Sequence, residues 1–236
     1  MKNETLNIEA AKGATTAYVA TPDETGGEAR KFVIVIQEYW GLNDNIKDVA
    51  NRYADEGFTA IAPDLYRGKI AKDKDEAAKM MSALELEDGL DIIKNTIALA
   101  QEKYGALHIG IIGFCMGGTY ALQAVCHLEG LNASAPFYGD IPDEATLQNL
   151  NAPVLFISAK QDEWITPERV RELELIAKNN MLPVKSVAYD ADHAFFNETR
   201  PEVFDPEAAK DAWAKVLAFF NENLAPKEIP LNIPSV

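Results

Sequence analysis

Cysteine and histidine are scarce in this sequence, which limits the chemistry that it can support. The 236 residues include two cysteines and three histidines. Because the histidines are scattered and no Cys-x-x-Cys pair occurs, we expect no metal site and no bound cofactor. Cys115 and Cys126 fall on one predicted helix, about 16 Å apart along its axis, which is too far for a disulfide. Two unbridged thiols are typical of a reducing compartment.

Long apolar runs and clusters of basic residues are missing as well. No stretch approaches the roughly 18 apolar residues of a membrane span, and the first residues, MKNETLNIEAAKG, lack the apolar centre of a secretory signal. The formal net charge is −15, and no Lys/Arg cluster offsets its repulsion of phosphates and anionic membranes. We therefore expect a cytoplasmic protein, a monomer or small homo-oligomer, with no nucleic-acid or membrane partner.

What the sequence does contain is a regular alternation of short β-rich runs and longer amphipathic runs. Nearly continuous apolar runs such as Lys31–Gln37 are typical of strands covered on both faces. Such alternation predicts a single α/β domain over residues 1–236, with a mainly parallel sheet between two layers of helices. A turn is expected at 22–30 and an irregular tail at 225–236. Strands are predicted at 17–20, 31–37, 58–63, 108–114, 133–138, 154–159 and 184–189, and helices at 45–56, 73–83, 88–104, 116–127, 143–150, 167–179 and 205–224.

The most informative segment is Gly113–Gly118, which has the form Gly-x-Cys-x-Gly between a predicted strand and a predicted helix. This pattern is typical of a nucleophile elbow, a sharp turn that lifts the reactive side chain clear of the sheet. Cys115 would lie at a helix N-terminus, where the partial positive charge favours a thiolate. The backbone N–H of Met116 would point at the developing oxyanion. The alternative is a buried structural cysteine beside glycines that merely permit close packing.

Elimination among the three histidines selects a base for such a nucleophile. His108 begins the strand that ends near Cys115 and lies roughly 20 Å from it, and His127 lies about 18 Å down the following helix. His193 follows the last predicted strand, and the carboxyl ends of parallel strands gather the functional loops at one edge. We therefore predict His193 as the base, with an ordinary loop histidine as the alternative.

An imidazole base needs a carboxylate to orient it. Asp162 follows the strand at 154–159 and precedes His193, which gives the order nucleophile, acid, base expected of such a fold. Asp140, after the preceding strand, is an alternative. Asp190 and Asp192 are too near His193 in sequence to orient its ring easily. Asp162 is therefore the predicted acid.

With these residues in place, the chain resembles the dienelactone hydrolase family of α/β-hydrolases. The resemblance implies an α/β-hydrolase fold and the triad Cys115, Asp162 and His193. A cysteine in the elbow, rather than a serine, is its most specific feature. The matching stretches run through nearly the whole chain in the expected order, and they are Gln37–Gly41, Ala62–Tyr66, Gly113–Gly118, Gln161–Asp162 and His193–Phe195.

Two further roles, both near the end of the first long strand, are implied by the same resemblance. Glu38 would hold and then accept the thiol proton, so that an oxidation-prone thiolate forms only with substrate. The alternative for Glu38 is a solvated charge at a strand end. The backbone N–H of Tyr39 would be the second oxyanion donor, beside that of Met116.

The chain departs from the dienelactone-cleaving members where these bind a substrate carboxylate with arginines. Asn197 stands where one arginine would follow the catalytic histidine, and the other position falls near Lys74. Arg67 and Arg200 are nearby candidates for an anion clamp, with an ordinary surface position as the alternative for each. Trp40 and Phe195 are predicted to contact substrate. The apolar side chains that would line an acyl pocket, or else pack in the core, are Trp40, Met80, Met81, Phe195 and Phe196.

Together these residues predict a hydrolase that cleaves carboxylic esters or lactones through an acyl-thioester on Cys115. Its partner would be a small-molecule ester or lactone. Two other classes stay open. One is a redox or sensor protein that uses Cys115, for which Cys126 is too distant to act as the resolving thiol. The other is a non-catalytic binding protein built on a hydrolase fold.

Overall fold

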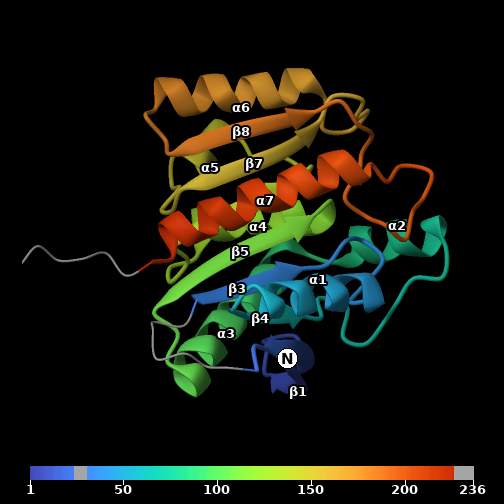
Figure 1. Ribbon diagram of the computed structural model, residues 1–236, viewed down its shortest axis with the longest axis vertical. Helices are drawn as coiled ribbons and strands as arrows, with labels where there is room; N and C mark the ends of the chain where they lie inside the picture. The colour runs from blue at the N-terminus through green and yellow to red at the C-terminus, as the bar shows by residue number, and fades with distance from the viewer. Residues whose placement is uncertain (24–30, 226–236) are drawn as a thin grey trace, which may run out of the picture.

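The sheet dominates the architecture of the chain. A computed structural model describes residues 1–23 and 31–225, so most of the turn expected at 22–30 and nearly all of the tail expected at 225–236 lie outside the described residues. The described strands form one eight-stranded sheet in the order β1-β2-β4-β3-β5-β6-β7-β8 (Figure 1). β2 is antiparallel to both of its neighbours, and the other pairs are parallel. The strands are β1 (Lys2–Ile8), β2 (Thr15–Thr21), β3 (Lys31–Ile36), β4 (Phe58–Pro63), β5 (His108–Phe114), β6 (Ala133–Phe137), β7 (Val154–Ala159) and β8 (Val184–Tyr189).

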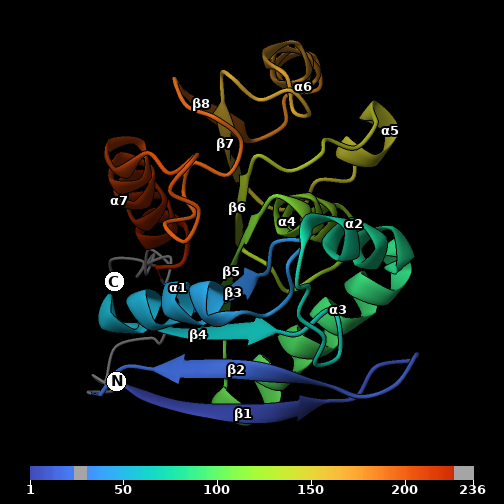
Figure 2. The same cartoon turned by 90° about the vertical axis from the view of Figure 1, so that its right-hand side faces the viewer.

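Helices cover both faces of this sheet (Figure 2). α1 and α7 pack against one face, and α3, α4 and α6 pack against the other. This arrangement confirms the predicted mainly parallel sheet between two helical layers. The helices are α1 (Asp44–Asp55), α2 (Lys74–Ala83), α3 (Leu86–Tyr104), α4 (Met116–His127), α5 (Glu144–Leu147), α6 (Pro167–Asn179) and α7 (Pro206–Asn223).

The apolar run of β3 shows how the two layers share the sheet. Successive side chains of a strand point to opposite faces. Phe32, Ile34 and Ile36 accordingly join the core cluster beneath α3 and α4. Val33 and Val35 join the cluster beneath α1 and α7. A strand buried in this way on both faces has no polar position, which explains why the sequence reads as a continuous hydrophobic run.

The topology gathers several loops at one edge of the sheet. β3 lies between β4 and β5, so the chain leaves β3 toward one side and later returns on the other. The crevice outside the carboxyl ends of parallel strands at such a reversal is a common ligand site. The segments that follow β3, β5, β6, β7 and β8 all begin at this edge. They carry Glu38, Cys115, Tyr138, Asp162 and His193.

One strand was not expected from the sequence. β1 pairs with β2 at the border of the sheet, and most of its side chains are exposed. An edge strand with an exposed surface needs no apolar alternation, so hydrophobic pattern alone misses it. None of the helices in the described ranges combines the length and the apolar character needed to cross a bilayer.

Candidate active site

Cys115 occupies the sharp turn between β5 and α4. Its φ of 54° and ψ of −116° are rare for a residue with a side chain. A Cβ added at Gly113 would overlap the carbonyl of Gly117, and one added at Gly117 would overlap the carbonyls of Ile36 and Gln37. The turn therefore brings helix and strands together more closely than any larger residue allows. This is the geometry of a nucleophile elbow, in agreement with the sequence motif.

The sulfur of Cys115 lies at the N-terminus of α4 but is mainly governed by burial. Burial raises the pKa of the thiol to about 12, and the nearby Glu38 carboxylate adds to this rise. A hydrogen bond from the backbone N–H of Met116 opposes it. The expected preference for a thiolate at the helix N-terminus is therefore outweighed, because desolvation penalises the charged form. Without a ligand, Cys115 is a protonated thiol.

His193 and Asp162 form a close pair, although their loops follow different strands. His193 Nδ1 lies 2.6 Å from Asp162 Oδ2. The other oxygen of Asp162 accepts the backbone N–H groups of Trp164 and Ile165 at 2.8 and 2.9 Å. Burial alone would raise the pKa of Asp162, but these hydrogen bonds outweigh it and lower the pKa. Asp162 is thus a buried carboxylate that fixes one nitrogen of the imidazole.

The alternative carboxylates make no hydrogen bond to His193 among the described residues. Asp140 is exposed and accepts the backbone N–H of its neighbour Ile141 at 2.9 Å. Asp190 accepts a hydrogen bond from Gln161, and Asp192 is exposed. His108 and His127 stand at the far ends of β5 and α4, as the sequence predicts. Asp162 and His193 are therefore the acid and imidazole that the fold brings together.

Glu38 is buried immediately after β3. Its Oε2 accepts a hydrogen bond of 2.6 Å from the Nδ2 of Asn197. Its Oε1 is buried and has no partner among the described residues. Burial raises the pKa of Glu38, against the opposing effects of Asn197, Arg200 and His193. The alternative of a solvated charge does not hold, since Glu38 is only 3% exposed.

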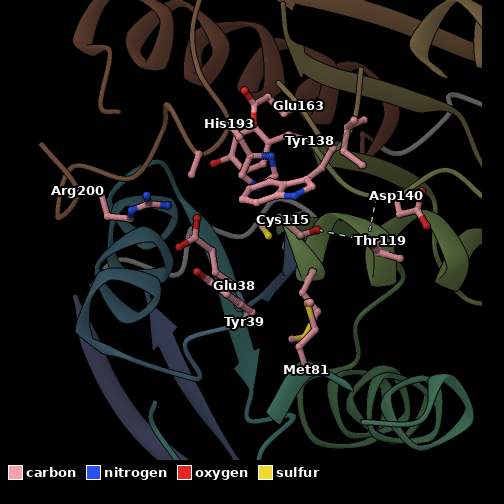
Figure 3. A pocket seen from close by; sticks show the side chains of 14 residues that line it. Glu38, Tyr39, Met81, Cys115, Thr119, Tyr138, Asp140, Glu163, His193 and Arg200 are labelled. Atoms are coloured by element: carbon pink, nitrogen blue, oxygen red, sulfur yellow. Dashed lines mark hydrogen bonds between the residues drawn. The ribbon is translucent and has the colours of Figure 1, made fainter. Parts of the chain in front are cut away.

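These groups meet in a cavity of about 500 Å³ (Figure 3). The sulfur of Cys115, the ring of His193 and the carboxylate of Glu38 point into it from three different loops. Tyr39 and Met116, the predicted oxyanion donors, also line it. His193 Nε2, the nitrogen that would face a reacting group, is buried without a hydrogen-bond partner among the described residues. The free nitrogen and the orphaned Glu38 oxygen leave polar groups available to a substrate.

The predicted apolar contacts need correction. Neither Trp40 nor Phe195 lines the cavity. Phe195 is fully buried, with its ring 5.7 Å from that of Tyr138 and 5.2 Å from that of Tyr189. Trp40 packs edge-on against Tyr39, with ring centroids 4.6 Å apart. Sequence adjacency to Glu38 and His193 was a poor guide, because Trp40 and Phe195 both lie in turns, where the direction of a side chain does not follow from its position in the sequence.

Other apolar candidates divide between core and cavity. Met80 packs into the core and Phe196 stacks on Phe114, whereas Met81 lines the cavity. The sequence interpretation missed Trp164, whose ring stands edge-on to His193 at 4.8 Å. Its place in the loop after β7, next to the predicted acid, was a signal that could have identified it. Other lining residues that were not predicted as contacts are Thr119, Tyr138, Asp140, Glu163, Ile165 and Ala194.

The two candidate arginines also separate. Arg67 makes a two-pronged ion pair with Asp88 at 2.7 and 2.8 Å and does not line the cavity. Arg200 does line it and points toward Glu38 (Figure 3), while its Nε donates to Glu202 at 3.0 Å. In the described part of the chain, no group of three or more His, Cys, Asp or Glu side chains is placed to hold a metal ion.

Comparison with known proteins shows the family to which the chain is related. The family model described as "Dienelactone hydrolase family" matches residues 15–224. The chain is 39% identical over 220 residues to "Protein usf" of Aquifex pyrophilus, covering 88% of this chain and 93% of that protein. It is 36% identical to "Putative carboxymethylenebutenolidase" of Aquifex aeolicus, with the same coverage of 88% and 93%.

Solved structures extend the agreement to three dimensions. The crystal structure titled "Putative Dienelactone Hydrolase from Klebsiella pneumoniae" superposes with a TM-score of 0.85 at 28% identity. The match covers 94% of this chain and 100% of that one. The sequence motif, the shape of the sheet and the comparisons all lead to the same assignment: the chain belongs to the dienelactone hydrolase family and has the α/β-hydrolase fold.

Proposed function

We propose that this hydrolase cleaves carboxylic esters or lactones through an acyl-thioester on Cys115, with His193 and Asp162 completing a triad. The observation that carries the proposal is the meeting of an elbow cysteine with a carboxylate-bound imidazole in one cavity. Nucleophile, base and orienting acid in such an arrangement are the requirements of covalent acyl transfer. The name of the carboxymethylenebutenolidase relative supports a lactone as the first substrate class to test.

In the proposed acylation, the substrate carbonyl oxygen binds the backbone N–H groups of Tyr39 and Met116. Glu38 takes the proton of Cys115, and the resulting thiolate forms a bond to the carbonyl carbon. The tetrahedral intermediate collapses with loss of the leaving oxygen. His193, as an imidazolium held by Asp162, gives its proton to that oxygen. The products are a free alcohol, or the opened end of a lactone, and the acyl-thioester.

In the proposed deacylation, His193 accepts a proton and Glu38 gives one up. Neutral His193 takes a proton from water, and the hydroxide adds to the thioester carbonyl. The carbon–sulfur bond breaks, which releases the carboxylic acid and the Cys115 thiolate. Glu38 returns the proton that it held, so the thiol and the imidazolium are both restored. Keeping the thiol protonated between turnovers protects it from oxidation.

A redox role for Cys115 has weaker support. Reaction with peroxide requires a thiolate, and burial raises the pKa of this thiol to about 12. Cys126 is buried near the other end of α4, far from the cavity. The predictions of a single domain, a cytoplasmic location and a small oligomer remain proposals.

Hydrolysis of p-nitrophenyl acetate, together with a panel of lactones, tests the proposal. We expect Cys115→Ala and His193→Ala to lower kcat/KM by roughly 10³-fold or more, because triad members act as a unit. The matched controls Cys126→Ala and His108→Ala change residues outside the cavity and should stay within about threefold of the parent. Equal rates for the parent and Cys115→Ala would favour a non-catalytic binding protein.

A further inference from the structure

Asn197 is the only residue that donates a hydrogen bond to Glu38 among the described side chains. It lies in the loop that carries His193 and is 2% exposed. Both backbone groups of Asn197 are hydrogen-bonded. Its N–H donates to the Ala194 carbonyl at 3.0 Å, and its carbonyl accepts the backbone N–H of Arg200 at 3.1 Å. The loop after β8 thus ties a buried amide to a buried carboxylate that follows β3.

The orientation of the Asn197 amide is determined by its neighbours. Its Oδ1 accepts the backbone N–H of Thr199 at 3.0 Å and the Thr199 hydroxyl at 2.6 Å. A backbone N–H can only donate, so the atom that faces Thr199 must be the oxygen. The NH₂ group therefore faces Glu38. A flipped amide would set two donors against each other and leave two acceptors in contact.

This hydrogen bond gives the two oxygens of the Glu38 carboxylate different surroundings. Oε2 is occupied by Asn197, whereas Oε1 is buried without a partner and belongs to a side chain that points into the cavity with Cys115. An N–H donated to a carboxylate stabilises its charged form. Asn197 therefore leaves Oε1 free for the thiol. Its hydrogen bond to Oε2 opposes the rise in the pKa of Glu38 that burial causes.

Several other groups face Glu38 from the elements around it. His193 and Arg200, from the loop after β8, favour the ionised carboxylate. Burial raises the pKa of Cys115 from the elbow, of Tyr39 beside Glu38 and of Tyr138 after β6, and the Glu38 charge adds a smaller rise to each. Arg200 already donates to the exposed Glu202. Asn197 is thus the sole direct hydrogen-bond donor within this ring of partners.

We propose that Asn197 is a positioning residue that sets the pH at which Glu38 can receive the Cys115 proton. This inference rests on the proposed function, in which Glu38 is the proton acceptor. A fully charged donor at this position would hold the carboxylate ionised to lower pH. The neutral amide contributes a hydrogen bond without a charge, and it adds to the effects of His193 and Arg200 on the Glu38 carboxylate.

The sign of the effect follows directly. Asn197→Leu removes the N–H, so the pKa of Glu38 rises and the acid limb of kcat/KM moves to higher pH. Loss of a hydrogen bond to a charged group corresponds to a shift of about one to two pH units. Asn197→Asp places a second negative charge beside Glu38 and should move the limb at least as far in the same direction. Thr199→Val weakens the orientation of the amide alone and should give a smaller shift, again upward.

Two measurements across pH test the proposal. One is kcat/KM for p-nitrophenyl acetate. The other is the rate at which iodoacetamide alkylates Cys115, followed by mass spectrometry of the Cys115 peptide. Alkylation requires no hydrolase activity, since the sulfur simply displaces iodide. A failure of the proposed function, with no turnover, therefore leaves the alkylation profile able to report on Asn197 and Glu38.

The decisive control is a double-mutant cycle with Glu38→Gln, which has no carboxylate to titrate. The proposal predicts that the alkylation profile shifts upward for Asn197→Leu in the parent and does not shift in the Glu38→Gln background. The kcat/KM profile is compared in the parent background alone, because Glu38→Gln lacks the proposed proton acceptor. An unchanged acid limb in folded Asn197→Leu, or an equal shift in the Glu38→Gln background, would overturn it. If Asn197→Leu does not fold, Thr199→Val decides the same question with the same cycle.

Discussion

At the scale of single residues, the central feature of the site is the sulfur of Cys115, whose raised pKa favours the less reactive thiol form. Cys115 has the elbow geometry of a nucleophile, yet burial and the Glu38 charge raise its pKa to about 12. His193 Nε2 and Glu38 Oε1 both lack hydrogen-bond partners among the described residues. A buried polar group without a partner is costly.

The raised pKa of Cys115 leads to a prediction about the reactivity of its thiol. Since a raised pKa keeps the thiol protonated at pH values below it, Cys115 should be alkylated at pH 8 at least about tenfold more slowly than a free cysteine of pKa near 8.5. Iodoacetamide kinetics with peptide mass mapping measure this rate. Unfolding in urea is the control, because it removes the burial and should restore the reactivity of both cysteines. A rate in the folded protein equal to that of free cysteine contradicts the prediction.

Residue-scale predictions were most definite where the chemistry left few choices. Only three histidines are present. Strand geometry excludes His108 and helix geometry excludes His127, so His193 could be selected from the sequence, and its place beside Asp162 is consistent with that selection. The substrate contacts Trp40 and Phe195 could not be judged in this way. Many aromatic residues fit a core as well as a pocket, and only the direction of each side chain separates the two.

At the scale of structural elements, the site depends on how closely α4 approaches the sheet. Gly113 in β5 and Gly117 in α4 leave no room for a Cβ between helix and strands. Gly117 lies against the carbonyl oxygens of Ile36 and Gln37, the residues that lead to Glu38. The same close contact therefore positions both the nucleophile and the segment that carries the proposed proton acceptor.

This packing makes Gly113→Ala a test of the elbow. The added methyl would overlap the backbone of Gly117, so we expect a loss of roughly 2–5 kcal/mol in the free energy of unfolding. Gly105→Ala is the matched control. Gly105 has a φ of 68° at the end of α3 and open space around it, so the change costs about 1 kcal/mol of left-handed strain. Urea denaturation measures both, and equal losses would show that the close contact is unimportant.

Most helices and strands could be predicted from the sequence, because a buried element has a regular pattern of apolar residues. β4, β5, β7, β8 and α6 match their predicted bounds, and Thr166 caps the N-terminus of α6. β1 was missed because an exposed edge strand has no such pattern. Other helix ends shifted by one to three residues: α3 begins at Leu86 rather than Asp88, and α5 ends at Leu147 rather than Leu150.

At the scale of the whole molecule, residues that are far apart in the sequence lie together at one edge of the sheet. Asp162 and His193 lie in the loops after β7 and β8, Cys115 lies in the turn after β5, and Glu38 lies just after β3. Order along the chain and the rule of carboxyl strand ends predicted this gathering. The helix N-terminus alone favoured a thiolate at Cys115, whereas burial raises the pKa of the thiol. That burial could not be derived from local sequence, because it depends on packing from several distant segments at once.

The whole catalytic cycle requires a covalent acyl group on one particular sulfur. A rapid acid quench during p-nitrophenyl acetate turnover, followed by peptide mass mapping, detects that group directly. The account predicts an acetyl group on the Cys115 peptide that hydroxylamine removes and that is absent from Cys115→Ala. Turnover with the acetyl group on another residue, or with no acyl-enzyme and undiminished activity in Cys115→Ala, would contradict it.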